Sequence, residues 1–156
     1  MTCFLVRQVP GKERMSDFEV LVDSDAFVGL FLPDDTHHKA CRLLFERFAK
    51  QRTNLVTTNY TVAETATVLS RRSGQSIARA FLDYIASGVF PIIYVDAAFQ
   101  EMAISLFMKQ GNKNMSLFDC ANVAVMRNLD IAEILSFDQV YSKKFGIPVS
   151  TGRKTK

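Results

Sequence analysis

The sequence predicts an α/β protein in which a parallel sheet of about five strands is flanked by helices in three layers, α/β/α. Short runs of apolar and β-branched residues alternate with longer segments whose apolar residues recur at helical spacing. Repeated strand–helix units of this kind favour parallel strands that are covered on both faces. A length of 156 residues, with 48% hydrophobic residues, fits one compact domain with a substantial core.

The first half of the chain holds two strand candidates, at residues 19–23 and 54–57. The first is almost purely apolar before its final residue, as expected of a strand buried on both faces. Pro33 should end the first helix, and Asp34 or Asp35 can cap the second. The helices expected here cover residues 25–32, residues 34 or 35 to about 52, residues 59–72 and residues 75–87.

The second half of the chain continues the same alternation. Its strand candidates are rich in isoleucine and valine, and its helix candidates carry apolar residues on one side. A loop is expected at residues 111–114, which are Gly, Asn, Lys and Asn. The expected strands are residues 91–95, 131–135 and 147–149, and the expected helices are residues 96–110 and 116–129.

The two ends of the chain differ from the patterned region. Met15 directly precedes that region, so we expect residues 1–14 to be an extension, or Met15 to be the true start. Residues 15–150 are expected to form the single domain, and residues 151–156 a basic tail. No apolar run reaches the roughly 20 residues that a membrane-spanning helix needs. The segment before Met15 lacks the features of a secretory leader.

Three widely spaced cysteines predict neither a disulfide framework nor a zinc site, because no CxxC pair is present. We therefore expect a soluble, cytoplasmic protein whose cysteines pack in a reducing compartment. The net charge of +3 permits a polyanionic partner but does not require one.

Acidic residues recur where the predicted fold brings strand ends together. Asp23 and Asp25 follow the first strand, Asp138 follows the fourth, and Asp119 stands at the start of a helix. Each of these aspartates, taken alone, can be a helix cap. Glu64 is different, because it is the only charged residue between positions 57 and 70, which indicates a half-buried acid with a specific partner. Since the carboxyl ends of parallel strands meet at one edge of a sheet, the acids should gather there.

Gathered carboxylates are the ligands that magnesium and manganese prefer, with substrate phosphate and water completing the coordination. One or two such ions can orient a water molecule, lower its pKa and stabilise the charge that develops on a phosphate. Without a cation the carboxylates repel one another, and at least one should have its pKa raised. No serine or cysteine nucleophile is needed for this chemistry.

Four ordered segments resemble the four acidic motifs of PIN domains, and most resemble those of VapC toxin ribonucleases in type II toxin–antitoxin systems. No single motif is specific, since each has one acid in an apolar setting, but their order and spacing match together over residues 18–149. The segments are Val-Asp-Ser-Asp-Ala-Phe at 22–27, Val-Ala-Glu-Thr-Ala-Thr-Val-Leu at 62–69, Ser-Leu-Phe-Asp-Cys-Ala at 116–121 and Leu-Ser-Phe-Asp-Gln-Val-Tyr at 135–141.

The resemblance implies a PIN-like sheet and RNA cleavage that depends on Mg²⁺ or Mn²⁺. It also implies a homodimer and an antitoxin protein whose segment covers the active site. The implied catalytic and metal-binding residues are Asp23, Glu64, Asp119 and Asp138, with Ser24 and Ser136 in supporting positions.

Other positions are assigned less directly by the resemblance. The family often has Asn or Ser where this chain has Asp25, so Asp25 could add a metal ligand or merely cap a helix. Arg71, Arg72 and Arg79 fall in a region that resembles the family's clamp and are candidates for contacts with RNA phosphates. His37 and His38 are expected to be surface residues at a helix start.

Two alternative functions remain open at the level of sequence. The segment from Asp23 to Asp25 also resembles the nucleophile motif of haloacid-dehalogenase-type phosphatases, in which the first aspartate is phosphorylated. Phe27 departs from that motif, and the lysine followed by paired acids that it requires is missing. The second alternative is a PIN-like module that binds RNA or protein without catalysis. A broken acidic quartet would favour it, but all four acids are present.

Overall fold

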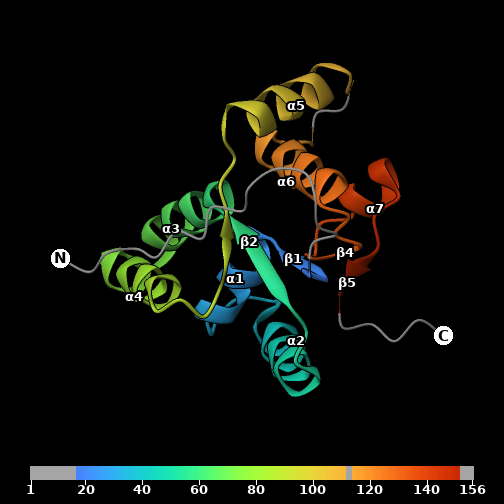
Figure 1. Ribbon diagram of the computed structural model, residues 1–156. Coiled ribbons are helices and arrows are strands. Elements are labelled where there is room, and N and C mark those ends of the chain that lie inside the picture. Colours follow the sequence, from blue (N-terminus) through green and yellow to red (C-terminus); the bar gives the residue numbers. More distant parts are fainter. Residues whose placement is uncertain (1–16, 112–113, 152–156) are drawn as a thin grey trace.

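Strand β1 (Val20–Val22) lies at the centre of a five-stranded sheet with the order β3-β2-β1-β4-β5, in which every pairing is parallel. The computed structural model in Figure 1 describes residues 17–111 and 114–151. The three residues of β1 are at most 2% exposed, as its apolar sequence predicts for a strand with neighbours on both sides. The other strands are β2 (Leu55–Thr58), β3 (Ile92–Ile93), β4 (Glu133–Leu135) and β5 (Val149–Ser150).

Seven helices in the described ranges cover the two faces of the sheet. Figure 1 shows α5, α6 and α7 together on one side and α1 to α4 on the other. None of the described helices is long and apolar enough to cross a membrane. The helices are α1 (Ser24–Phe31), α2 (His38–Gln51), α3 (Asn59–Ser73), α4 (Gln75–Ala86), α5 (Ala97–Met108), α6 (Leu117–Asn128) and α7 (Val140–Phe145).

The alternation of side chains along β1 divides the core into two clusters. Leu21 packs with the residues of α6 and α7, whereas Val20 and Val22 pack with those of α1 to α4. In the second cluster the ring of Phe27 lies 5.3 Å from that of Phe81, measured between centroids. Two cores on opposite faces of one parallel sheet confirm the predicted three-layer α/β/α fold class.

Several predicted element boundaries differ from those observed. The second helix begins at His38, not at position 34 or 35, and no side chain caps it. Asp35 instead accepts a hydrogen bond from the amide of His37 and pairs with Arg72 at 2.7 Å. This ion pair joins the loop before α2 to the end of α3, so Asp35 serves a tertiary contact rather than a helix cap.

The smaller differences lie in the short strands. The strand expected at residues 91–95 contains only Ile92–Ile93, and the one expected at 147–149 is Val149–Ser150. Helix α7 separates the last two strands and was foreseen only as a helix start at Asp138.

Cys41 and Cys120 are free and buried, in agreement with a packing role. The predicted extension at residues 1–14 and the proposed start at Met15 lie outside the described residues, as does all of the predicted tail at 151–156 except residue 151.

Candidate active site

An acidic pocket of about 370 Å³ lies at the carboxyl end of the sheet, where β1, the loop after β4 and the helices α3 and α6 converge. It contains all four members of the predicted acidic quartet. The described residues that line it include five carboxylates and no lysine, arginine or histidine. They are Asp23, Ser24, Asp25, Glu64, Asn114, Met115, Ser116, Asp119 and Asp138.

Asp23 is the most constrained of these acids and is 5% exposed. It follows β1 and caps α1, because its Oδ1 accepts a hydrogen bond from the amide of Ser24 at 2.8 Å. The same oxygen accepts from Nδ2 of Asn122 at 3.0 Å. Its Oδ2 lies 3.2 Å from the hydroxyl of Ser136 and 2.9 Å from that of Tyr141. Four polar groups therefore fix the orientation of this carboxylate.

Three carboxyl groups of the pocket have raised pKa values. Burial, followed by the charge of Asp25, raises the pKa of Asp23 well above its usual value of 3.8. Burial is also the main cause of the raised pKa of Asp25 and of the raised pKa of Glu64. The charge of Asp119 contributes to the shifts of Asp23 and Glu64. Such shifts are expected when carboxylates gather in the absence of metal.

Asp25 lies in the first turn of α1, and its side chain contacts the loop that follows β4. Its Oδ2 accepts hydrogen bonds from the amide of Phe137 at 2.7 Å and from the hydroxyl of Ser136 at 3.0 Å. Its Oδ1 is buried and has no hydrogen-bond partner among the described residues. A buried carboxylate oxygen without a donor is unfavourable, so this atom fits a site that a cation or a bound water would complete.

Asp119 and Asp138 each accept a hydrogen bond from a nearby backbone amide and also line the pocket. Oδ2 of Asp119 accepts from the amide of Ser116 at 2.7 Å and closes a capping box at the start of α6, while Oδ1 lies 3.1 Å from the hydroxyl of Tyr141. Oδ1 of Asp138 accepts from the amide of Val140 at 2.8 Å. Both aspartates are therefore held at fixed helix starts and still face the pocket.

Glu64 reaches the pocket from the side of α3. Thr58 caps this helix by accepting from the amide of Thr61, which fixes the start of α3 beside the end of β2. Glu64 is half-buried, and its carboxylate interacts with the hydroxyl of Ser24 and with the charges of Asp119 and Asp25. The isolated glutamate thus has specific neighbours, as its apolar sequence context indicated.

Two residues that the sequence did not single out belong to the same network. Asn122 and Tyr141 are fully buried, and both contact Asp23. Each stands three positions after a predicted site acid, and this spacing is the signal that could have identified them. Asn122 and Asp119 lie on the same face of α6, whereas Asp138 precedes α7 and Tyr141 lies in its first turn. Asn122 is also the one polar residue among the seven buried residues of α6.

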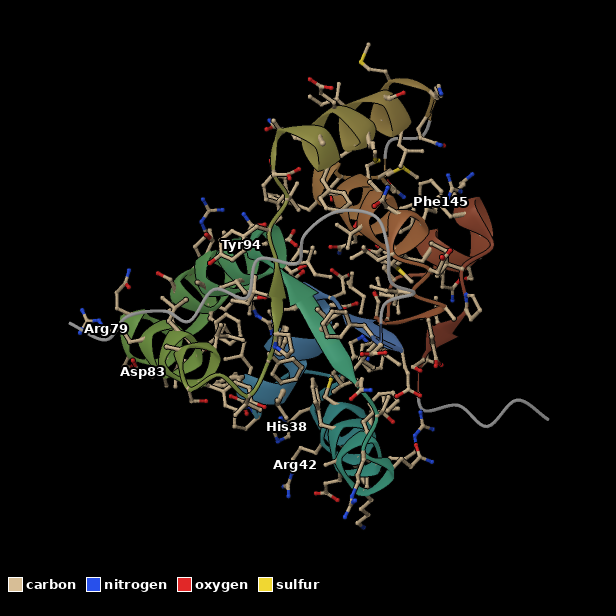
Figure 2. The ribbon with its side chains drawn as sticks, in the orientation of Figure 1. His38, Arg42, Arg79, Asp83, Tyr94 and Phe145 are labelled. Carbon is tan, nitrogen blue, oxygen red and sulfur yellow. The ribbon has the colours of Figure 1, made fainter. Side chains whose placement is uncertain are left out.

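The basic candidates lie away from the acidic pocket. None of Arg71, Arg72 and Arg79 lines it, and the guanidinium of Arg72 is paired with Asp35. Figure 2 shows Arg79 at the outer side of α4, remote from the sheet. His37 is exposed, as predicted, and its ring stacks on Phe137 with 4.0 Å between centroids.

The chemistry of the pocket fits a hard divalent cation. No group of three Asp, Glu, His or Cys side chains in the described ranges is arranged tightly enough to enclose a metal ion. Mg²⁺ does not require such a cage, because it keeps several waters and binds through one or two carboxylates together with substrate phosphate. The pocket supplies the appropriate ligands as carboxylate oxygens, and one of them is the unpartnered Oδ1 of Asp25. The carboxylates belong to Asp23, Asp25, Glu64, Asp119 and Asp138.

Known proteins share the sequence pattern and the fold of this chain. The PIN domain family model matches residues 20–145. The 23S rRNA-specific endonuclease VapC20 of Mycobacterium tuberculosis is 28% identical over 123 residues, which are 79% of this chain and 92% of that protein. Its crystal structure, described as that of a Sarcin-Ricin loop cleaving toxin, matches with a TM-score of 0.72 and 26% identity over 80% of this chain and 93% of that chain.

A chain in a toxin–antitoxin complex from Klebsiella pneumoniae shares the fold, with a TM-score of 0.60 and 14% identity over 88% of this chain and 100% of that chain. PIN-domain nucleases of the VapC type generally depend on a divalent metal. These similarities confirm the predicted nuclease class and do not favour the phosphatase or the inactive module. The chain belongs to the PIN-domain family.

Proposed function

We propose that this protein is a divalent-metal-dependent endoribonuclease that hydrolyses phosphodiester bonds in RNA and acts as the toxin of a toxin–antitoxin pair. One observation carries the proposal: five carboxylates, drawn from four separate parts of a PIN-domain chain, line one pocket at the carboxyl end of the sheet. Asp23, Glu64, Asp119 and Asp138 are the proposed catalytic and metal-binding residues.

Mg²⁺ or Mn²⁺ is the proposed cofactor, held by the quartet with Asp25 as a further ligand through its unpartnered Oδ1. When bound, such an ion supplies Lewis acidity, which lowers the pKa of a water molecule and neutralises charge on the scissile phosphate. The protein's own contribution is to hold the carboxylates before substrate arrives. Asp23 is fixed by four contacts, Asp119 by the capping box at the start of α6, and Asp138 by the amide of Val140.

Ser24 and Ser136 are the proposed supporting residues. The hydroxyl of Ser136 lies within hydrogen-bond distance of both Asp23 and Asp25, so it links two carboxylates that would otherwise repel each other. Ser24 provides the amide that binds Asp23, and its hydroxyl interacts with Glu64. Both serines therefore act by orienting carboxylates rather than as nucleophiles.

Ribosomal RNA is the substrate that we propose to test first, because the related VapC20 is a 23S rRNA-specific endonuclease. Arg71, Arg72 and Arg79 are proposed contacts for RNA phosphates outside the pocket. A cytoplasmic location follows from that substrate. The toxin–antitoxin complex among the structures that share the fold supports an antitoxin partner, and a homodimer is proposed from the family resemblance.

The central test compares RNA cleavage by the wild type and by Asp23→Asn with Mg²⁺ or Mn²⁺, using 23S rRNA and a fragment that spans the Sarcin-Ricin loop. We expect the rate to fall by about 100-fold or more, which corresponds to about 2.7 kcal/mol of transition-state stabilisation. EDTA should abolish wild-type cleavage. Asp83→Asn is the matched control, because Asp83 is an exposed acid on α4 outside the pocket (Figure 2). Equal rates for the wild type and Asp23→Asn, or no cleavage by either, would contradict the proposal.

A further inference from the structure

Three carboxylates of the pocket are joined by two hydroxyl groups in one continuous chain. Asp25 and Asp23 share the hydroxyl of Ser136, at 3.0 and 3.2 Å. Asp23 and Asp119 share the hydroxyl of Tyr141, at 2.9 and 3.1 Å. Ser136 and Tyr141 both stand in the fourth acidic motif, at residues 135–141, but Tyr141 does not belong to the acidic quartet or to its supporting serines.

The hydrogen of the Tyr141 hydroxyl must point toward the carboxylates. Nδ2 of Asn122 lies 3.2 Å from the tyrosine oxygen and donates to it, so one lone pair of that oxygen is already occupied. The orientation of the Asn122 amide is fixed in turn, because its Oδ1 faces the hydroxyls of Thr58 at 3.2 Å and Thr61 at 3.3 Å. The remaining direction of the tyrosine O–H leads to Asp23 or Asp119.

The position of this hydroxyl is set by a rigid part of the molecule. The side chain of Tyr141 is 0% exposed, and its ring packs in the core cluster that includes the buried residues of α6. Helix α7 begins at Val140, directly beside the loop that carries Asp138. Close packing leaves a buried ring little freedom to move, so the hydroxyl of Tyr141 is held beside the carboxylates of Asp23 and Asp119.

We propose that Tyr141 is a positioning residue that holds Asp23 and Asp119 together as ligands of one divalent-cation site. The inference rests on the proposed metal-dependent function and adds a residue to it. Two neighbouring carboxylates repel each other in a buried site, and a donor placed between them offsets that repulsion. Groups that orient metal ligands in this way typically contribute about 10-fold to 100-fold to metal affinity. Tyr141 acts through the two aspartates and contacts no substrate.

The variant Tyr141→Phe tests this role, because it keeps the buried ring and removes only the hydroxyl. Mn²⁺ binding, measured by calorimetry and by electron paramagnetic resonance without RNA, should weaken by about 10-fold or more. The KM for RNA should not change. The kcat should fall at a Mn²⁺ concentration that half-saturates the wild type and should largely recover at saturating Mn²⁺. Tyr84→Phe is the matched control, since Tyr84 is half-buried on α4 and has no carboxylate contact among the described residues.

Wild-type Mn²⁺ affinity in a folded Tyr141→Phe protein would overturn the assignment, whatever its thermal stability. So would a fall in kcat that saturating Mn²⁺ does not restore. If Tyr141→Phe does not fold, a second measurement replaces the binding assay. It records the ultraviolet difference spectrum of the Tyr84→Phe protein when Mg²⁺ is added. A buried-tyrosine signal is expected there, and its absence would also overturn the proposal. Because metal binding is measured without RNA, failure of the wild type to cleave RNA contradicts the proposed function alone.

Discussion

At the scale of single residues, each aspartate of the quartet has a local role and a role in the pocket. Asp23 caps α1, Asp119 completes the capping box of α6, and Asp138 accepts from the amide of Val140. A carboxylate can accept about four hydrogen bonds, so capping leaves directions free for other partners. The capping interpretation and the site interpretation of these aspartates are therefore compatible, and capping is what fixes the carboxylates in place.

In the metal-free protein, we expect Asp23→Asn to raise the free energy of unfolding at neutral pH. The pKa of Asp23 is raised in the folded state, so the folded protein binds this proton more tightly than the unfolded chain does. The resulting stabilisation is full below the usual pKa of 3.8 and is lost as the pH rises through the raised value. Each unit of pKa elevation corresponds to about 1.4 kcal/mol.

Thermal unfolding in EDTA between about pH 4 and about pH 8 measures this effect. The wild type should lose stability more steeply with rising pH than the asparagine variant, and the two should converge near the acidic end. Adding Mg²⁺ at neutral pH should stabilise the wild type more than the variant, because binding to the folded state shifts the equilibrium. A pH-independent difference between the two proteins would count against a raised pKa of Asp23.

The sequence predicted the acids of the site better than it predicted their neutral partners. Glu64 stands out because a charge in an apolar segment needs a reason. Asn122 and Tyr141 do not stand out, since a tyrosine in a helix is ordinarily a core residue and one asparagine is a weak signal. Their role depends on contacts with Asp23, which is 99 and 118 positions away. Only the folded chain establishes those contacts.

At the scale of elements, the approach of α2 to α1 depends on a glycine. A Cβ built on Gly29 would lie 2.5 Å from Sγ of Cys41 and 3.4 Å from Cβ of His37. The carbonyl of Gly29 also lies 2.8 Å from Nδ1 of His38. Helix α1 carries Ser24 and Asp25 at its start, so this contact between helices supports one wall of the acidic pocket.

We expect Gly29→Ala to destabilise the fold by about 1 to 3 kcal/mol, because the added methyl group overfills a packed helix contact. The double variant Gly29→Ala, Cys41→Ala lacks the sulfur that the added methyl group would meet. It should therefore be less destabilised than the sum of the two single variants. Chemical denaturation of the four proteins measures the coupling. Gly111→Ala is the control, because a Cβ there meets no atom within 4 Å. If the two single losses in the free energy of unfolding simply add in the double variant, the contact between the methyl group and the sulfur does not cause the destabilisation.

The helix starts show where local sequence rules did and did not suffice. Ser116 and Asp119 form the capping box that the sequence indicated. The expected cap of α2 was wrong, because Asp35 is held by Arg72 of α3. A cap depends on a few neighbouring residues, whereas the partner of the second Asp35 oxygen is an arginine 37 positions away, which the local pattern does not reveal.

At the scale of the whole molecule, the parallel sheet explains why distant acids meet. Alternating strands and helices predicted the parallel sheet, since each crossover returns the chain to the same edge. The order of the strands was not predicted, because it depends on which faces the helices cover. With β1 between β2 and β4, the carboxyl end of β1 lies beside the loop that carries Ser136 and Asp138.

The distribution of arginines over the surface leads to a prediction about RNA binding. Arg71→Ala and Arg79→Ala should each raise the KM for RNA, with little change in kcat, because these exposed residues lie outside the pocket. For each RNA phosphate that is no longer neutralised, the slope of log affinity against log salt should fall by about 0.7 on single-stranded RNA. Arg72→Ala should have a smaller effect on KM, because its guanidinium is already paired with Asp35.

Fluorescence anisotropy with labelled RNA at several salt concentrations measures these slopes. Arg42→Ala is the control, since Arg42 is an exposed arginine on α2 that pairs with Glu46 within its own helix (Figure 2). If the Arg71 and Arg79 variants keep the wild-type slope, RNA takes a path over the protein that avoids α3 and α4.

The pairing of β1 with β4 also affects when activity can arise during synthesis. Asp23 leaves the ribosome early, but β4, Ser136, Asp138 and Tyr141 follow more than 100 positions later. A nascent chain that stops before β4 has only part of the acidic pocket and lacks the strand that pairs with β1 on the side opposite β2. The acidic pocket therefore cannot be complete until nearly the entire domain has been translated.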